Sequence, residues 1–585
     1  MNAAILSRHP DQPDAWALWH APREIIEAGT PGEVPRALAR VEAAAHDGLH
    51  ALGFVAYEAG VAFDARFATH TAPCDLPLVW FAVFERPLTY PIPLASEPSE
   101  APWLPGLDEN SYRENIERIK QHIANGETYQ VNYTFPLHAT GTPLMKSLFA
   151  RLNEVQPTPY AMYIETPAFR IASVSPELFF RLNGETITCE PMKGTCRRAP
   201  HPGLDETVGE TLRNSRKNRA ENLMIVDMIR NDLGRIAASG TVKVDKLFEV
   251  TPWPTLWQMT STVSAKTNAT LPEIFQAMFP CASITGAPKL KTSEIIASLE
   301  KQPRGLYTGA IGWFGPGRRG QFAVAIRTAV QTNHTTYGVG SGIVWDSGAG
   351  DEYRECLLKA RILGDDEGDH FHLLETMRWS TGQGYLFLEG HLQRMQLSAR
   401  HFGFACDINA IKLQLEHVAE NFEPVDQRVR VLLQRDGIIE IQHATLTDEA
   451  FCDDPETAPV LNAVIDSDRQ LIDSPFLYHK TNRREVYEQA RARFPGADDT
   501  LLVNERDELM EFTNGNVVIR RGNQWLTPPL AAGLLPGVYR HHLLATGYIK
   551  EAMLPLDALE PDDQLYFINS VRGWRATNVT RDVVS

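Results

Sequence analysis

The lysine in CEPMKGT, residues 189–195, has a setting that suits amine chemistry. The preceding run GETITCE, residues 184–190, reads as a strand, and Gly194 after the lysine indicates a turn. An unprotonated amine is a nucleophile, and desolvation beside a divalent cation lowers a lysine pKa toward neutrality. Most lysines only carry a charge in solvent. Lys193 alone therefore leaves both readings open.

A carboxylate on the apolar face of an expected helix is a second candidate. In ENLMIVDMIRNDLGRI, the apolar positions with helical spacing are Ile225, Ile229, Leu233 and Ile236. Glu221 lies one turn before Ile225 on the same face. Burying an unpaired carboxylate is costly, so Glu221 needs a partner. An arginine or a helix N-terminus would serve, and the residues alone do not choose between partners.

The elements that position these residues form a mixed pattern. Strand-like runs such as RIASVSPELFFRL alternate with helical runs such as DENSYRENIERIKQHIANG before residue 364. The acidic segment GDDEGD, residues 364–369, then separates a helical pattern from a strand-like restart, HFHLLETMRW. We expect a mixed α/β chain with two domains, residues 1–365 and 366–585. The first is expected to have two layered subdomains around one site.

Composition narrows the class of protein. The 585 residues exceed one ordinary hydrophobic core, and the net charge of −17 disfavours nucleic acid and anionic membranes as partners. The opening residues have no basic start followed by an apolar core, and PLVWFAVF is far shorter than a membrane span. The seven cysteines are scattered, without a C-x-x-C pair. We expect a soluble cytoplasmic protein with reduced thiols.

Five ordered motifs carry a family resemblance. SPELFF, PMKGT, ENLMIVDMIRNDLGRI, SITGAPKLKTSEII and GSGIVWDSGAGDEYRE follow one another in the first half. Together they resemble the chorismate-utilising family of anthranilate, aminodeoxychorismate, isochorismate and salicylate synthases. The resemblance spans roughly residues 50 to 363 and implies the chorismate-utilising-enzyme fold.

The resemblance implies roles for individual residues. Mg²⁺ would be bound by Glu221 and Glu355, with Glu352 in support, and would hold the ring carboxylate of chorismate. The implied substrate contacts lie at Thr285, Gly286, Tyr307, Arg327, Gly340 and Gly342. Among these, Tyr307 and Arg327 would bind the enolpyruvyl carboxylate, because the planar guanidinium matches a carboxylate. From its spacing alone, Arg327 fits a buried residue that binds loop carbonyls equally well.

The lysine distinguishes members of this family. Anthranilate synthases usually carry alanine at the position of Lys193, whereas aminodeoxychorismate synthases carry lysine. The resemblance implies that the amine attacks C2 of chorismate while Glu177 protonates the departing C4 hydroxyl. Gln258 stands where the family commonly has histidine. Glutamine can hydrogen-bond the leaving oxygen but cannot carry a proton, so acid catalysis is expected to depend on Glu177.

The second half resembles a different family. LLETMRW, EGHLQRMQLSARHFG, FLYHKTNRREVYEQAR, LMEFTNGNVVI and PPLAAGLLPGVYR are similar to motifs of fold-type IV pyridoxal-phosphate enzymes. That group includes branched-chain and D-amino acid aminotransferases and aminodeoxychorismate lyase. The resemblance covers about residues 370 to 580 and implies a fold-type IV domain of two subdomains, which associates as a homodimer.

This second resemblance implies a pyridoxal 5'-phosphate site. Lys480 would bind the cofactor aldehyde and later move a proton, and Glu511 would pair with the pyridine nitrogen. Arg394 would hold the phosphate, together with the amides of Val538 and Tyr539. Ser570 is a weaker candidate for a phosphate or carboxylate contact.

Together the resemblances imply consecutive reactions on chorismate. The first half would make 4-amino-4-deoxychorismate, and the second would release pyruvate to give 4-aminobenzoate, a folate precursor. No cysteine has the G-x-C-x-G surroundings of a glutamine amidotransferase, so ammonia is expected from solution or a separate glutaminase subunit. The alternatives are an anthranilate-type synthase fused to an aminotransferase, an aminotransferase with a chorismate sensor, and a non-catalytic assembly subunit.

Overall fold

The computed structural model describes residues 3–70, 75–91, 101–200, 202–253, 256–363, 371–446 and 450–581. The predicted boundary segment GDDEGD and Cys74 lie outside these residues. By its internal contacts the chain divides into two units, Met1–Cys196 with Glu210–Asp366 and Arg197–Gly209 with Glu367–Ser585. Sequence patterns did not indicate that residues 197–209 belong with the second unit. Within the described ranges, every helix is too short or too polar to cross a membrane.

The first unit contains two ten-stranded sheets. The first sheet, in spatial order, comprises β16 (Gly286–Ala287), β8 (Gln130–Ala139), β20 (Thr335–Ile343), β19 (Thr328–Gln331), β10 (Arg170–Ser173), β9 (Met162–Glu165), β1 (Ala4–His9), β2 (Gln12–His20) and β6 (Leu88–Tyr90), with β7 (Trp103–Pro105) paired to β8. The second comprises β13 (Met192–Arg197), β15 (Leu256–Lys266), β12 (Thr186–Glu190), β11 (Leu178–Asn183), β18 (Arg319–Val324), β17 (Ala310–Gly315), β4 (His50–Val55), β5 (Val79–Phe84) and β3 (Glu24–Ala28), with β14 (Lys243–Pro252) paired to β15.

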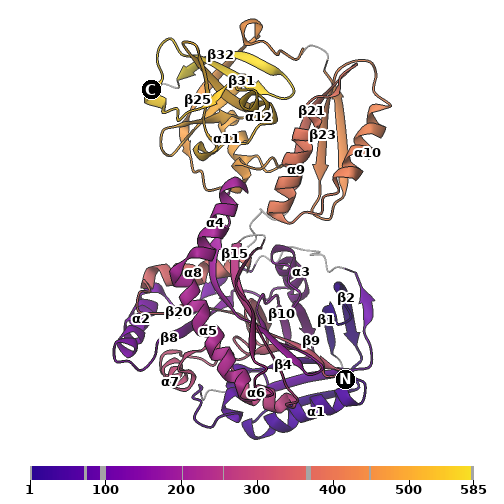
Figure 1. The fold of residues 1–585 in the computed structure, drawn as a ribbon, viewed down its shortest axis with the longest axis vertical. Helices are drawn as coiled ribbons and strands as arrows, with labels where there is room; N and C mark the ends of the chain where they lie inside the picture. The colour runs from indigo at the N-terminus through magenta and orange to yellow at the C-terminus, as the bar shows by residue number, and fades with distance from the viewer. Residues whose placement is uncertain are drawn as a thin grey trace. The chain divides into compact units, whose positions relative to one another are not determined.

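Helices cover the outer faces of these sheets. The helices that pack on them are α1 (Val34–His46), α2 (Glu109–Ala124), α3 (Met145–Val155), α5 (Arg216–Gly234), α6 (Leu271–Met278), α7 (Lys289–Leu299) and α8 (Ala349–Ala360). The division between the two units falls within α4 (Pro202–Asn214). One buried cluster joins α1, α5 and α6 to the second sheet, and another joins α2, α3, α7 and α8 to the first. A third fills the space between the sheets. Figure 1 shows α1 and α6 side by side on their shared face.

Strand pairing places the glycines of the expected substrate site. β20 pairs antiparallel with β8, so that Gly340 lies opposite Thr134 and Gly342 opposite Asn132. Lys193 differs from its expected position before a turn, because it lies within edge strand β13. Gly194 has a φ of +90° inside that strand, a left-handed conformation that suits glycine. The turn signal in the sequence therefore corresponds to a bend in the strand.

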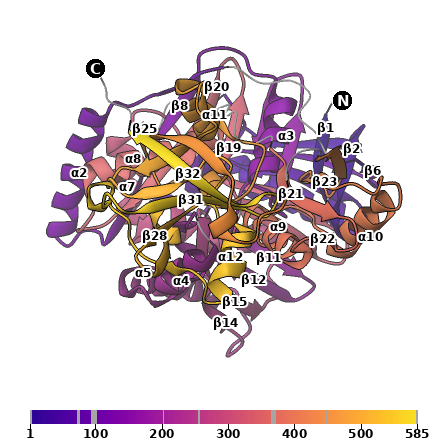
Figure 2. The ribbon, with the colours of Figure 1, turned by 90° about the horizontal axis from the view of Figure 1, so that it is seen from above.

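The second unit has a small sheet and a large one. The small sheet comprises β22 (Gly384–Tyr385), β21 (Leu373–Ser380), β23 (Gln427–Leu433) and β24 (Ile439–Thr445), and its core includes residues of α9 (Leu388–Phe402) and α10 (Ile408–Ala419). The large sheet comprises β27 (Leu509–Phe512), β26 (Asp499–Asn504), β25 (Val460–Gln470), β32 (Gly573–Arg581), β31 (Gln564–Asn569), β28 (Gly515–Arg521), β29 (Gln524–Thr527) and β30 (Lys550–Glu551). Figure 2 shows β25, β32 and β31 in adjacent positions. The helix α11 (Glu485–Arg493) lies between β25 and β26 in the sequence, and α12 (Val538–Ala545) lies between β29 and β30.

Candidate active sites

The amine of Lys193 and the backbone of Gly342 meet in the first unit. The Nζ atom of Lys193 lies 3.3 Å from the position that a Cβ atom on Gly342 would occupy. Gln130 Nε2 lies 2.5 Å from the same position. A side chain at residue 342 would therefore compete with both nitrogens for space. The structure thus brings together two residues that sequence motifs placed in one site, and adds Gln130, for which the motifs gave no signal.

Burial changes the acid–base properties of Lys193. Desolvation lowers the pKa of its amine below the ordinary lysine value, because the charged form is disfavoured away from water. The carboxylates of Glu177, Glu221 and Glu355 oppose this shift, whereas the charge of Lys359 adds to it. Lysine with a lowered pKa holds more of its amine in the neutral, nucleophilic form at a given pH.

Glu177 is a buried acid that acts on the same amine electrostatically. Its side chain is 4% exposed, and Ser283 Oγ donates a hydrogen bond to Oε1 at 2.6 Å. Burial raises the pKa of this carboxyl, while the Ser283 hydrogen bond and the Lys193 charge oppose the rise. The two groups therefore have pKa values shifted toward a neutral amine and a protonated acid. Ser283 belongs to the SITGAPK motif, but its contact was not foreseen.

The predicted metal ligands Glu221 and Glu355 both raise the pKa of the Lys193 amine through their charges. Glu221 is half-buried on α5 and Glu355 lies on α8. Glu352 is occupied differently, because it accepts hydrogen bonds from Ser341 and from Ser347. Glu355 also pairs with Lys359 at 2.7 Å. Lys359 lies four residues after Glu355, a spacing that signals an ion pair on a helix.

A site with only two protein carboxylates is typical of Mg²⁺, whereas other metals are often bound by protein ligands alone. Among residues whose placement the structure describes, no group of three or more His, Cys, Asp or Glu side chains is arranged to hold a metal. Mg²⁺ usually takes one or two carboxylates and completes its octahedron with water and substrate oxygens. Glu221 and Glu355 are oxygen donors of the kind that Mg²⁺ prefers, and binding of Mg²⁺ by them stays a prediction.

The remaining predicted substrate contacts occupy the surrounding loops and strands. Thr285 is buried and donates to Cys281 O at 3.0 Å, and Gly286 has a φ of +134°. The ring of Tyr307 rests on Gly338, where a Cβ atom would lie 2.2 Å from its Cγ. Lys359 Nζ donates to Gly340 O at 2.9 Å.

Arg327 has a structural partner of its own. Its Nη1 donates to the backbone oxygen of Lys359. This contact agrees with the reading of Arg327 as an arginine that binds backbone carbonyls. Carboxylate binding by Arg327 stays a prediction.

Gln258 has a contact that the sequence did not foresee. Its side chain is 5% exposed, and its Nε2 donates to Gly194 O at 3.1 Å and to Met259 O at 3.3 Å. An amide nitrogen has two hydrogens to donate, so both are directed to backbone oxygens. Gln258 therefore holds the bend that follows Lys193, and the expected hydrogen bond to a leaving oxygen would require it to give up one of these contacts.

In the second unit, Lys480 follows a short helical turn and lies in a cationic setting. Burial and the charges of Arg394 and Arg484 lower the pKa of its amine to about 7, while Glu375 and Glu511 oppose the shift. The backbone oxygen of Lys480 accepts from Leu374 N at 2.9 Å, which anchors it beside β21. An amine with this pKa is about half in its neutral, nucleophilic form at neutral pH.

Glu511 is held in place by hydrogen-bond donors. It is 3% exposed on β27 and accepts from Tyr487 Oη at 2.8 Å and Leu535 N at 3.0 Å through Oε1. Its Oε2 accepts from Asn516 Nδ2 at 3.2 Å. Burial raises the pKa of this carboxyl to about 7. A carboxyl held in one position in this way could serve as the partner of a pyridine nitrogen.

Arg394 forms a buried cluster with two residues that sequence reasoning missed. It donates to both oxygens of Glu375, at 2.8 and 2.7 Å, and its Nη1 donates to Pro536 O at 3.0 Å. His391 Nδ1 lies 2.6 Å from Glu375 Oε2. His391 Nε2 is buried and has no hydrogen-bond partner in the described part of the chain. The sequence signal for this cluster was only that Glu375, a charged residue, lies among the apolar residues of β21.

The contact with Pro536 places Arg394 beside the start of α12. Val538 and Tyr539 are the first residues of that helix and are both buried, and their amides have no partner within the helix. Ser570 is also buried, but no hydrogen bond within the described ranges links it to Arg394 or Lys480. The structure thus groups Lys480, Arg394 and Glu511 and leaves the role of Ser570 a prediction.

Comparisons with known proteins identify the family. Residues 16–365 match the chorismate binding enzymes, and residues 372–578 match the class IV amino-transferases. The chain therefore belongs to the chorismate-binding enzymes and carries a class IV amino-transferase domain after that fold. These findings confirm the fold class and both resemblances inferred from the motifs.

Individual relatives cover parts of the chain. Aminodeoxychorismate synthase of Streptomyces pristinaespiralis is 41% identical over 268 residues, 44% of this chain and 37% of that protein. Aminodeoxychorismate synthase component 1 of Escherichia coli is 37% identical over 265 residues, 45% of this chain and 58% of that protein. The chain thus covers less than two thirds of either relative. Anthranilate synthase component I of Streptococcus pneumoniae has a TM-score of 0.51 at 22% identity, covering 62% of this chain and 92% of that one, which shows a shared fold.

Proposed function

We propose that the chain makes 4-aminobenzoate from chorismate in two steps. The first unit would replace the C4 hydroxyl of chorismate with an amino group, and the second would eliminate pyruvate from the product. The observation that carries the first step is the approach of Lys193 Nζ to Gly342, 3.3 Å from where a Cβ atom would stand, and the opposite directions of the pKa shifts at Lys193 and Glu177 agree with it. The relatives named aminodeoxychorismate synthase support the same assignment.

In the first step, Lys193 would form a bond from Nζ to C2 of chorismate. The ring double bonds shift as the C4–O bond breaks, and Glu177 donates its proton so that the hydroxyl leaves as water. Ammonia would then bond to C4, and the C2–N bond would break to return the lysine. Glu221 and Glu355 would hold Mg²⁺, which would neutralise the ring carboxylate of chorismate.

In the second unit, several residues fit pyridoxal phosphate. The buried Nε2 of His391, which has no hydrogen-bond partner in the described part of the chain, and the lowered pKa of Lys480 both fit a site for a polar cofactor with an aldehyde. When bound, the cofactor would accept electrons from the bond broken at the amino-bearing carbon. Lys480 would bind the cofactor aldehyde and take the proton from C4 of the ring. Glu511 would face the pyridine nitrogen, and Arg394 with the first amides of α12 would face the phosphate.

Loss of that proton and of the C3–O bond would aromatise the ring and release enolpyruvate. The amino group that the first step installs at C4 is the group that the second site needs. Ammonia would come from solution or from a separate glutamine amidotransferase, as the component 1 names of relatives suggest. A homodimer formed through the second unit belongs to the same proposal, as does a cytoplasmic location.

The decisive experiment gives the purified chain chorismate, Mg²⁺, ammonium and pyridoxal phosphate, and identifies the aromatic product by chromatography and mass. We expect 4-aminobenzoate and an equal amount of pyruvate. Anthranilate as the product would instead support the anthranilate-type alternative. If chorismate is not consumed, the first unit does not act as proposed.

A further inference from the structure

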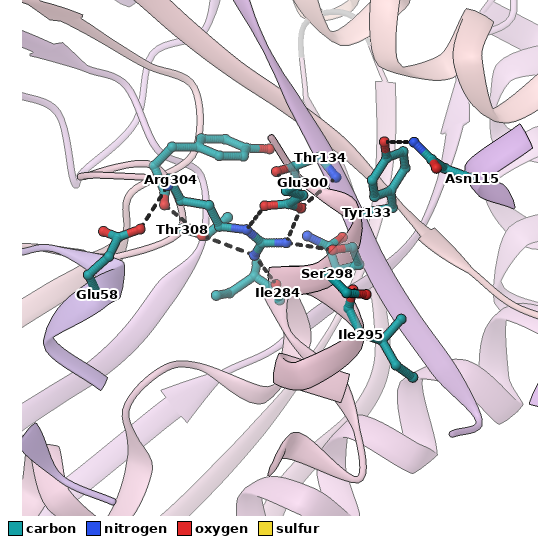
Figure 3. A network of polar contacts seen from close by, with 12 residues as sticks. Glu58, Asn115, Tyr133, Thr134, Ile284, Ile295, Ser298, Glu300, Arg304 and Thr308 are labelled. Atoms are coloured by element: carbon teal, nitrogen blue, oxygen red, sulfur yellow. Dashed lines mark hydrogen bonds and ion pairs between the residues drawn. The ribbon is translucent and has the colours of Figure 1, made fainter. Parts of the chain in front are cut away.

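Arg304 and Glu300 form a buried ion pair in the first unit, just after the end of α7. Arg304 Nε and Nη2 donate to the two oxygens of Glu300 at 2.8 and 2.7 Å (Figure 3). The side chains of Arg304 and Glu300 are only 2% and 7% exposed. The guanidinium also stacks 4.6 Å from the ring centre of Tyr57. This geometry uses the planar fork of arginine, which lysine cannot reproduce.

The guanidinium also bonds to two segments of the expected chorismate site. Nη1 donates to Ile284 O at 3.1 Å, immediately before Thr285, and Nη2 donates to Asn132 O at 2.7 Å. Asn132 lies opposite Gly342 in the sheet, and its amide donates to Thr285 O at 3.0 Å. Arg304 therefore connects the segment of Thr285 with the strand that faces Gly342.

The backbone of Arg304 supports the segment of Tyr307. Its oxygen accepts from Tyr307 N at 3.1 Å, and its amide donates to Glu58 Oε1 at 2.8 Å. Nη1 also lies 3.3 Å from Thr308 Oγ1. Figure 3 shows Glu58, Thr308 and Ile284 converging on Arg304 from separate elements. The turn that presents Tyr307 is thus fixed at its first residue.

Glu300 bonds to a second position of β8, the strand that also carries Asn132. Its Oε1 accepts from Thr134 N at 3.0 Å and from Thr134 Oγ1 at 2.9 Å. Thr134 lies opposite Gly340, and its Cγ2 is 2.6 Å from the position of a Cβ on that glycine. The carboxylate therefore fixes β8 beside Gly340, so the pair bonds to the segments of Thr285 and Tyr307 and to the strand that faces Gly340 and Gly342.

A buried ion pair is a poor way to gain stability alone, because desolvation offsets much of the attraction. A well-packed apolar pair would fill the same volume but would leave the oxygens of Ile284 and Asn132 without donors. The contacts of this pair go to backbone beside substrate residues instead of to solvent. The ion pair is therefore arranged to hold the backbone segments of Ile284 and Asn132 in fixed positions relative to each other.

We propose that Arg304 and Glu300 are positioning residues that set the spacing of Thr285, Tyr307 and Gly340 for chorismate binding. This inference rests on the proposed function of the first unit. Neither residue touches the expected reacting atoms, so the pair acts through the segments it joins. The expected consequence of disturbing it is weaker substrate binding more than slower chemistry.

The test compares Arg304→Lys with Arg170→Lys, a control at an exposed arginine that pairs with Glu165 at 2.9 Å. Ammonia-dependent chorismate consumption gives KM and kcat, and thermal unfolding reports the fold. We expect KM for chorismate to rise at least tenfold in Arg304→Lys, with a smaller change in kcat and an unchanged pH profile. The control should keep KM within twofold of the wild type.

A milder variant covers the case in which Arg304→Lys does not fold. Thr134→Val removes the hydroxyl bond to Glu300 and leaves the ion pair intact, and we expect KM to rise two- to fivefold. With both variants folded, the double variant should show a KM change smaller than the product of the single changes. An unchanged KM in folded Arg304→Lys, or in Thr134→Val if the former is unfolded, overturns the inference. If the wild type consumes no chorismate, the proposed function fails first and the inference falls with it.

Discussion

The amine nitrogen of Lys193 lies 3.3 Å from where a Cβ atom on Gly342 would stand, although 149 residues separate them in the chain. Gly342 lies on β20 and Lys193 on β13, which belong to different sheets of the first unit. The absence of a side chain at residue 342 thus provides room for the reactive amine. The relationship yields a direct test.

Gly342→Ala should strongly reduce amination of chorismate without unfolding the protein. The new methyl group would displace Lys193 Nζ and Gln130 Nε2, which is 2.5 Å from its position. A displacement of about 1 Å at a reacting group costs about 100-fold in rate. Initial rates of chorismate consumption measure the effect. Gly350→Ala is the control, because its Cβ would meet Glu109 at an ordinary 3.5 Å.

The opposite pKa shifts at Lys193 and Glu177 predict a bell-shaped pH profile for the first reaction. The rate should rise with pH as the Lys193 amine loses its proton, and fall as Glu177 loses the proton it donates. The rising and falling parts of the profile should both lie between the ordinary pKa values of glutamate and lysine. This is because burial lowers the pKa of Lys193 and raises the pKa of Glu177. A profile that is flat across this range contradicts the assignment of the two groups.

Glu177→Gln separates the two groups. The Glu177 carboxylate raises the pKa of Lys193, so its neutral replacement should lower that pKa further. Competitive labelling with fluorodinitrobenzene at a series of pH values, followed by peptide mass analysis, measures the lysine directly. Exposed Lys246, which pairs with Glu249, is the internal control. An unchanged Lys193 pKa in the variant would show that the two groups do not interact.

The sequence predicted the local features of this site, such as which side of a helix is buried, better than the contacts between residues that are far apart in the chain. The apolar stripe of ENLMIVDMIRNDLGRI predicted a helix with Glu221 on its inward side, and α5 buries Ile225, Ile229 and Leu233. The strand before Lys193 was predicted two residues too long at its start, because β12 begins at Thr186. Periodicity reports which side of an element is buried and does not report its partner.

Long-range partners therefore escaped prediction. Nothing in LLETMRW indicates that Glu375 joins Arg394 and His391, because that contact depends on how α9 packs on β21. The i,i+4 spacing of Glu300 and Arg304 is visible in the sequence, but Pro303 between them disfavours a helix there, so the spacing alone does not predict an ion pair. The two residues pair just after the end of α7, where both side chains are buried.

Removal of Mg²⁺ should stop the first reaction and spare the second. Glu221→Gln should act in the same direction and raise the Mg²⁺ concentration needed for half-maximal rate at least tenfold, because it removes one of two protein carboxylates. Rates across a Mg²⁺ titration after chelator treatment measure this. Exposed Asp227 on the same helix, changed to Asn, is the control. A normal Mg²⁺ dependence in Glu221→Gln would mean that the ligand lies elsewhere.

The last prediction concerns Lys480 and the colour of the protein. Because burial and two arginines hold the pKa of this amine at about 7, apoprotein should bind pyridoxal phosphate covalently, more slowly below pH 7 where the amine is protonated. A visible absorption band should grow in, and borohydride should remove it while fixing the cofactor to Lys480. Lys480→Ala should lose the band and accumulate aminodeoxychorismate, while chorismate consumption continues in the separate first unit. Lys550→Ala, at an exposed lysine of β30, should keep the band and form 4-aminobenzoate. Labelling at Lys550 in the wild type would move the site, and a colourless wild type that still makes 4-aminobenzoate without the cofactor would refute the lyase assignment.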